Sequence, residues 1–175
     1  MDAIDREILW RQFGAAIDML EGALADCPDD LWEERLWEDS PDQWVAAGFS
    51  TFWYVAYHTL FWLDLYLTGE EEEQFVPPVP FAVVEMEPDD VLPRVYTRDE
   101  LLTYLAHCRQ KCQETIGALA GEQAYRLCRY PWGEVSFVEL QLYNLRHVQE
   151  HGAQLRMFLG QRATKSAEWI SGVTD

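Results

Sequence analysis

The sequence contains one pair of histidines four residues apart, His147 and His151, and this pair is its clearest candidate for a chemical site. In a helix, residues four apart lie one turn above each other on the same face, roughly 6 Å apart along the axis. Both imidazoles could therefore bind one metal ion. The alternative is that each ring is hydrogen-bonded separately in a core, and the H-x-x-x-H spacing also occurs by chance. The pair alone leaves both interpretations open.

The sequence predicts a helix over residues 136–159 that carries this pair. Ser136 can accept a hydrogen bond from the backbone N–H of Glu139, whose side chain can reach back, and Val135 can pack on Leu140. At about 100° per residue, one largely apolar stripe of this helix contains both histidines. We expect that stripe to be buried; it consists of Leu140, Asn144, His147, His151, Leu155 and Phe158.

A third histidine, His58, lies in the middle of a second predicted helix, over residues 50–68. Ser50 is the expected N-cap and Gly69 the expected stop, and the segment is apolar nearly all round. A lone histidine in such a helix is usually structural, but this one could supply a third nitrogen. Asp64 lies about 240° further round the helix, so we do not expect it in the same site.

The remaining periodic segments complete an all-α, four-helix bundle. Residues 3–26 and 97–120 are also predicted helices, the latter opened by a capping box and closed by Gly121. Residues 69–96, rich in proline and glutamate, form a long crossover between helices two and three, which we expect to separate these two helices. We assign residues 1–160 to one bundle domain and residues 161–175 to a loose polar tail.

The composition of the chain argues against several classes of partner. The chain has 31 acidic and 13 basic residues, and its net charge of −18 argues against nucleic acid or an anionic membrane as a partner. Residues 44–63 are uncharged, yet acidic residues flank them without a basic anchor, so we do not expect a membrane span. Four cysteines without a signal peptide favour reduced thiols in the cytoplasm. Cys108 and Cys112 lack the spacing of a redox or zinc-knuckle pair.

If helices two and four pack together, His58, His147 and His151 form a set of three nitrogen ligands. Structural zinc sites are closed by four protein ligands, whereas three protein ligands and an open position are typical of catalytic zinc. An ion bound in this way lowers the pKa of a bound water or thiol.

Two segments resemble the signature helices of the DinB/YfiT-like superfamily of metal-dependent enzymes. These are residues 50–67, with His58 eight residues after Ser50, and residues 144–155, which are similar to the H-x-x-x-H-x-G-Q-L pattern but have Gly-Ala-Gln in place of x-Gly-Gln. The resemblance implies an up-down-down-up bundle, commonly a homodimer. It also implies a divalent ion, zinc or nickel, held by His58, His147 and His151.

The same resemblance implies a thiol-dependent transferase or an isomerase that acts on small molecules, using a low-molecular-weight thiol. It identifies no catalytic residue beyond the metal ligands. Glu150 and Gln154 lie near the histidine pair and could orient a ligand by hydrogen bonding. An anionic cofactor would have to be held mainly by arginines such as Arg146 or Arg156.

Two other functions compete with this one. His147-Val-Gln-Glu150-His151 also matches the H-x-x-E-H peptidase motif, with Glu150 as general base, but that motif needs an acidic ligand well downstream, and the one glutamate that follows is Glu168, in the tail. The alternative from a different class is a non-enzymatic dimeric helical bundle whose metal is structural or absent, since a fold does not determine a function.

Overall fold

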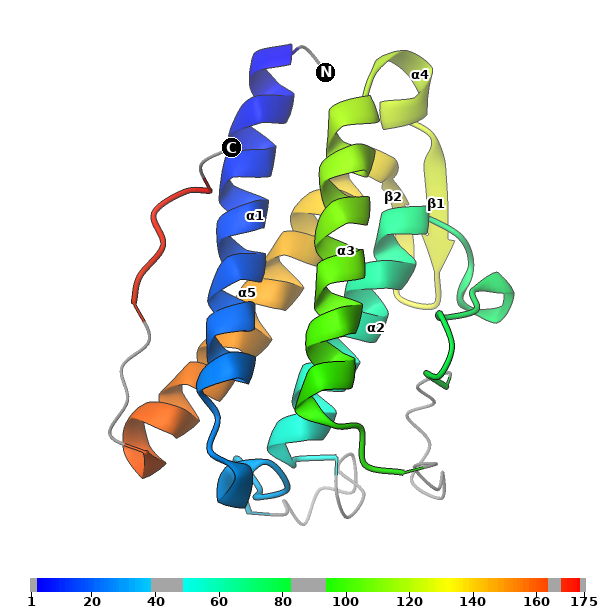
Figure 1. Cartoon of the computed structure of the whole chain (residues 1–175). Coiled ribbons are helices and arrows are strands. Elements are labelled where there is room, and N and C mark those ends of the chain that lie inside the picture. Colours follow the sequence, from blue (N-terminus) through cyan, green and yellow to red (C-terminus); the bar gives the residue numbers. More distant parts are fainter. Residues whose placement is uncertain (1–2, 39–48, 83–93, 164–167, 174–175) are drawn as a thin grey trace.

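The computed structural model describes residues 3–38, 49–82, 94–163 and 168–173 (Figure 1). Four long helices make up most of it, and the all-α four-helix prediction is confirmed. They are α1 (Ala3–Asp26), α2 (Phe52–Thr68), α3 (Arg98–Ala118) and α5 (Phe137–Arg162). The shorter elements are the 3-10 helices η1 (Asp29–Leu31) and η2 (Glu72–Gln74), helix α4 (Gly121–Ala124), and the strands β1 (Leu127–Tyr130) and β2 (Gly133–Ser136).

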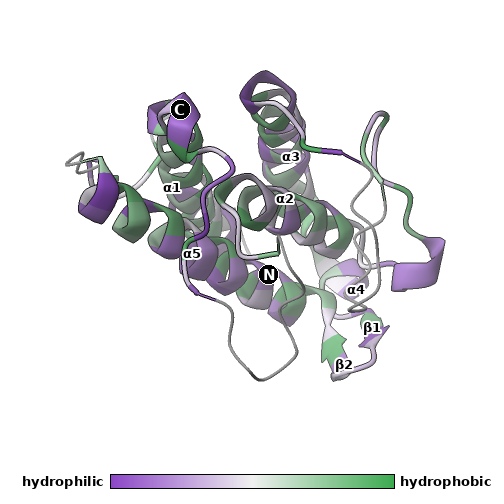
Figure 2. Cartoon of the chain, turned by 90° about the horizontal axis from the view of Figure 1, so that it is seen from below, coloured by the Kyte–Doolittle hydropathy of each residue, from purple (hydrophilic) through white to green (hydrophobic). Residues whose placement is uncertain are grey.

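The four long helices pack in a closed ring. α1 contacts α3 and α5, and α2 contacts the same two helices from the other side (Figure 2). α1 and α5 run in one direction, and α2 and α3 run in the other (Figure 1). The expectation that the long crossover separates helices two and three is wrong, because α2 and α3 are neighbours. The crossover instead returns the chain to the opposite end of the bundle, so that two adjacent helices can be parallel.

Helix α2 is the most buried of the four, as its apolar composition predicts. Fourteen of its 17 residues are buried, and in Figure 2 it lies between α3 and α5. Gly69 ends it in the left-handed conformation, at φ 65°, which favours glycine because a side chain there is strained. Among the described residues, no helix combines the length and the apolar character needed to cross a membrane.

Two helix ends differ from the prediction. α2 begins at Phe52, and its N-cap is Thr51 without a side-chain cap, whereas we expected Ser50. The cause is tertiary: Thr51 is still extended because it forms a β-bridge with Arg35, and the Ser50 carbonyl before it accepts from Leu36 N–H. α3 ends at Ala118, and Gly121 opens the short helix α4 instead of closing α3.

A β-hairpin joins α4 to α5 and fixes where α5 begins. β1 and β2 pair antiparallel, with Tyr130 opposite Gly133, and the last strand residue, Ser136, is also the N-cap of α5. The C-terminal residues 168–173 lie along α1, where Val173 is buried against Gly14 and donates its N–H to the Arg11 carbonyl. This part of the expected loose tail is therefore packed on the bundle.

Candidate metal centre

Local capping places the histidine pair on α5. The Ser136 hydroxyl accepts a hydrogen bond from Glu139 N–H, as predicted, so the helical register is set eleven residues before His147. Leu140, Leu155 and Phe158, from the predicted inward stripe, are buried. His147 and His151 therefore turn toward α2.

Two buried amides fix α5 against α2 in the register that the site requires. Gln141 Nε2 donates to the Tyr66 carbonyl at 2.9 Å, and Asn144 Nδ2 donates to the Leu63 carbonyl at 3.1 Å. Both side chains are 0% exposed, so each bond is made away from water. Sequence reasoning placed Asn144 on the buried stripe but gave neither amide a role. The available signal was a pair of amides three residues apart, one turn before the first histidine.

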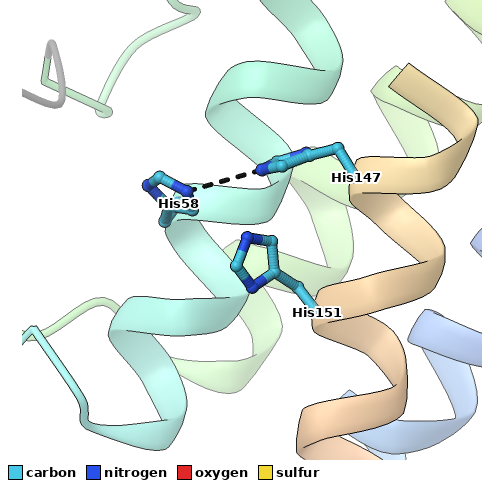
Figure 3. A group of neighbouring side chains, drawn as sticks. All are labelled: His58, His147 and His151. Carbon is cyan, nitrogen blue, oxygen red and sulfur yellow. Dashed lines mark hydrogen bonds between the residues drawn. The ribbon is translucent and has the colours of Figure 1, made fainter. Parts of the chain in front are cut away.

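The three candidate histidines converge between α2 and α5. Figure 3 shows His58 on α2 and His147 and His151 on α5 with their rings directed toward one another. The Nε2 atoms of His58 and His147 are 3.4 Å apart, and one nitrogen from each of the three rings lies within 4.8 Å of the others. In the described part of the chain, this is the one group of three His, Cys, Asp or Glu residues close enough to share an ion.

These separations fit a metal ion. With zinc–nitrogen bonds of about 2.0 to 2.1 Å and tetrahedral angles, two ligand nitrogens stand about 3.3 to 3.4 Å apart. The pair His58 and His147 already has this spacing. The separations that involve His151 are within 4.8 Å, so a small turn of that ring would complete a three-nitrogen set.

Burial keeps the three imidazoles neutral. Desolvation, with a smaller contribution from His151, lowers the pKa of His58 to about 3. Desolvation also lowers the pKa of His147 well below its usual value, and the neighbouring histidines add to this effect. The pKa of His151 is lowered by burial as well, against the opposing effects of Gln154 and Glu150. Neutral imidazoles have the free lone pair that metal binding needs.

Gln154 sets the tautomer of His151. Its Oε1 lies 2.8 Å from His151 Nδ1 and can only accept, so Nδ1 carries the hydrogen and Nε2 keeps its lone pair. Of the two residues expected to orient a ligand, Gln154 therefore makes such a contact. Glu150 is exposed and acts on His151 through its charge. The Nδ1 of His147 is buried and has no partner among the described residues.

Several further ionisable side chains lie elsewhere. Asp64 faces α3, where its carboxylate accepts from Tyr104 Oη and Lys111 Nζ. His107 is half-exposed and is 3.8 Å from the same carboxylate. Arg156 Nη1 donates to Met19 Sδ, on α1. Two cysteines, Cys108 and Cys112, are free and buried, and burial raises the pKa of both thiols.

The peptidase alternative gains no support. Glu168, the one glutamate downstream of His151, is exposed, and its backbone carbonyl accepts a hydrogen bond from Arg156. It is not part of the group of described residues that could share an ion.

Comparison with known proteins identifies one family. The family model of the DinB superfamily matches residues 12–155, which contain all three histidines and most of the four long helices. Comparison with curated proteins finds no significant match, and comparison with solved structures finds none. The match covers more than half of the chain, and the all-α fold is consistent with it. The chain belongs to the DinB superfamily.

Proposed function

We propose that this protein is a divalent-metal-dependent enzyme in which His58, His147 and His151 bind a zinc or nickel ion and leave one coordination position open. The observation that carries the proposal is the 3.4 Å separation between the Nε2 atoms of two neutral, partly buried imidazoles on different helices, with a third imidazole beside them. Membership of the DinB superfamily supports it.

The reaction we propose is a thiol-dependent transfer, or a related isomerisation, on a small molecule. A bound zinc or nickel ion would lower the pKa of a thiol or water at the open position and make it nucleophilic near neutral pH. The protein's own contribution is positional. Gln154 holds the His151 tautomer, and Gln141 and Asn144 hold α5 against α2, so the three nitrogens stay at a fixed separation.

Metal analysis of protein prepared without a histidine tag tests whether the chain binds an ion. We expect about one ion per chain, lost in the His58→Ala/His147→Ala/His151→Ala variant. A screen of thiols and electrophiles on metal-loaded protein then tests the proposed thiol-dependent reaction. Bound metal without any turnover would favour a non-enzymatic bundle with a structural ion, and absence of bound metal would favour the bare bundle.

We further propose that the protein is a homodimer. A pocket of 290 Å³ lies between α1 and α5 and is lined mainly by apolar side chains, of which Ile8 is 56% and Leu142 52% exposed. A second copy could cover them. Light scattering should give twice the mass of one chain, and Leu142→Glu should give a monomer. The four free cysteines support our expectation of a reducing, cytoplasmic location.

A further inference from the structure

The described surroundings of the three histidines are aromatic. On α2, Tyr54 and Trp62 flank His58 at ring-centroid distances of 6.5 and 6.2 Å. Tyr66, one turn further along, lies 6.4 Å from the His147 ring and 5.4 Å from Tyr143. A molecule bound beside the ion would therefore meet mainly flat apolar rings.

Most of the positive charge of the chain is held away from this site. Of the 13 basic residues, 12 are described and one, Lys165, lies outside the described residues. Nine of the 12 bind carboxylates or backbone carbonyls elsewhere. These are Arg6, Arg94, Arg98, Arg109, Lys111, Arg126, Arg129, Arg156 and Arg162.

The other three described arginines lie either on a segment other than α2 and α5 or on another face of α5. Arg11 lies on α1 beside Gly172, and Arg35 is on the segment that pairs with Thr51. Arg146 precedes His147, but at about 100° per residue it points roughly 120° away from the midpoint of His147 and His151. The segments 39–48 and 83–93, outside the described residues, contain six acidic residues and no basic residue.

This distribution limits the charge of the bound molecule. One thiolate or hydroxide can be neutralised by a divalent ion, because three imidazoles leave the ion's charge uncompensated. A second anionic group on the same molecule would lie near aromatic rings, in a chain of net charge −18, without a guanidinium or ammonium partner. Burial of an unpaired carboxylate or phosphate is unfavourable.

Trp62 adds a specific contact for an uncharged molecule. Its indole Nε1 is buried and has no hydrogen-bond partner in the described chain, and the residue stands one turn after His58 on α2. An indole N–H can only donate, so it suits a neutral acceptor such as a carbonyl, amide or ether oxygen.

We propose that the substrate or thiol bound beside the three histidines has an apolar, preferably aromatic body and no negative charge beyond the atom that binds the metal, with Trp62 as its positioning residue. This inference rests on the proposed function, since it concerns a molecule bound next to the ion.

Cobalt(II)-loaded protein allows a test that needs no activity assay, because a thiolate bound to cobalt absorbs light by charge transfer. The probes are 4-mercaptobenzamide and 4-mercaptobenzoate, which have the same ring and thiol but differ in charge, with mercaptoacetamide as the non-aromatic amide. We expect 4-mercaptobenzamide to bind at least about tenfold more tightly than the other two probes. The dissociation constants are compared for the thiolate form of each probe. The difference in affinity between 4-mercaptobenzamide and 4-mercaptobenzoate should decrease at high salt, because salt screens charge.

Two tryptophan variants test the positioning residue. Trp62→Phe removes the indole N–H while keeping an aromatic ring, and it should weaken 4-mercaptobenzamide binding by about fivefold to tenfold without changing cobalt affinity. Trp169→Phe is the matched control, since Trp169 is 68% exposed and belongs to the C-terminal segment that lies along α1; it should leave the affinity unchanged.

The outcomes separate this inference from the proposed function. If cobalt-loaded protein bound 4-mercaptobenzoate as tightly as 4-mercaptobenzamide, or more tightly, the inference would be overturned. The proposed metal site would not be affected by this result. An equal loss in both tryptophan variants would overturn the role of Trp62. If neither the wild-type protein nor the triple alanine variant bound cobalt, the proposed function would be wrong. This inference would then be wrong as well.

Discussion

The Nε2 atoms of His58 and His147 lie 3.4 Å apart although 89 positions separate the two residues in the chain. A direct hydrogen bond at this distance requires one of the two nitrogens to carry a hydrogen. An ion between them requires both nitrogens to present lone pairs. The two states therefore differ in the tautomer of at least one ring, and they respond differently to added metal.

Added zinc should stabilise the folded chain through His147. At a zinc concentration about 100 times the dissociation constant, the free energy of unfolding should rise by about 2.7 kcal/mol. Urea denaturation with and without zinc measures this. His147→Ala should abolish the gain, whereas His107→Ala should keep it, because His107 is half-exposed and lies beside Asp64. Equal stabilisation of both variants would contradict the assignment of His147 as a ligand.

Stability of the metal-free chain should fall as the pH falls below about 6.5. The pKa of His58 is about 3 in the folded state and near 6.5 in the unfolded chain. Between these values the unfolded chain binds a proton that the folded chain does not, so lowering the pH favours unfolding. The lowered pKa values of His147 and His151 act in the same direction.

Measurement of the free energy of unfolding between pH 7 and pH 5.5 isolates this effect, because most carboxylates stay ionised there. His58→Gln cannot take up the proton and should have a shallower slope. A slope that is the same in the wild type and in this variant would show that His58 does not titrate with a lowered pKa.

Gln154 should raise metal affinity without binding the ion. Its Oε1 accepts from His151 Nδ1 at 2.8 Å, and loss of such a bond from a histidine ligand costs about 10- to 100-fold in affinity. Competition with a chromogenic chelator measures the loss in Gln154→Leu. Glu150→Gln is the control: its side chain is exposed, so we expect a smaller change. Unchanged metal affinity in both variants would contradict an orienting role for Gln154.

The buried carboxylate of Asp64 should stabilise the contact between α2 and α3 only while its partners remain. It is 1% exposed and is bound by Lys111 and Tyr104. Lys111→Met removes the ammonium partner of the carboxylate and leaves the hydrogen bond from Tyr104. The loss of stability should approach the roughly 3 to 5 kcal/mol seen for broken buried pairs, reduced because Lys111 is 26% exposed.

The matched double variant, Asp64→Asn/Lys111→Met, removes the charge together with its partner and should recover part of that stability. Chemical denaturation of the two variants compares them directly. Metal affinity should be unchanged in both, since this network lies on the α3 side of α2. A double variant less stable than Lys111→Met would contradict this account.

Gly69 should tolerate no side chain. Its φ of 65° strains other residues, and an added Cβ would lie 2.6 Å from an Arg126 guanidinium nitrogen and 2.8 Å from Phe137. Gly69→Ala should therefore lower the free energy of unfolding by more than about 1 kcal/mol. Gly22→Ala, inside α1 with nothing within 4 Å of its Cβ, should raise it by up to about 1 kcal/mol. Thermal melts of the two variants should shift in opposite directions.

Much of the local structure could be predicted because its causes lie within a few residues. The capping box at Thr97 and the cap at Ser136 formed as expected, and Gly69 ended α2. The start of α2 could not be predicted in this way, because the partners of Ser50 and Thr51 are Leu36 and Arg35, on another segment.

The helices, the inward stripe that carries His147 and His151, and the family resemblance that the DinB superfamily match confirmed could all be predicted from the amino-acid order. Three features became visible only in the folded chain: His58 meets the histidine pair, α3 packs beside α2, and Gln141 and Asn144 hold the two site helices together. The difference lies in the sequence distance over which each interaction acts. Periodicity and capping act over one or two turns, whereas the partner of a buried face depends on how all four helices exclude water together.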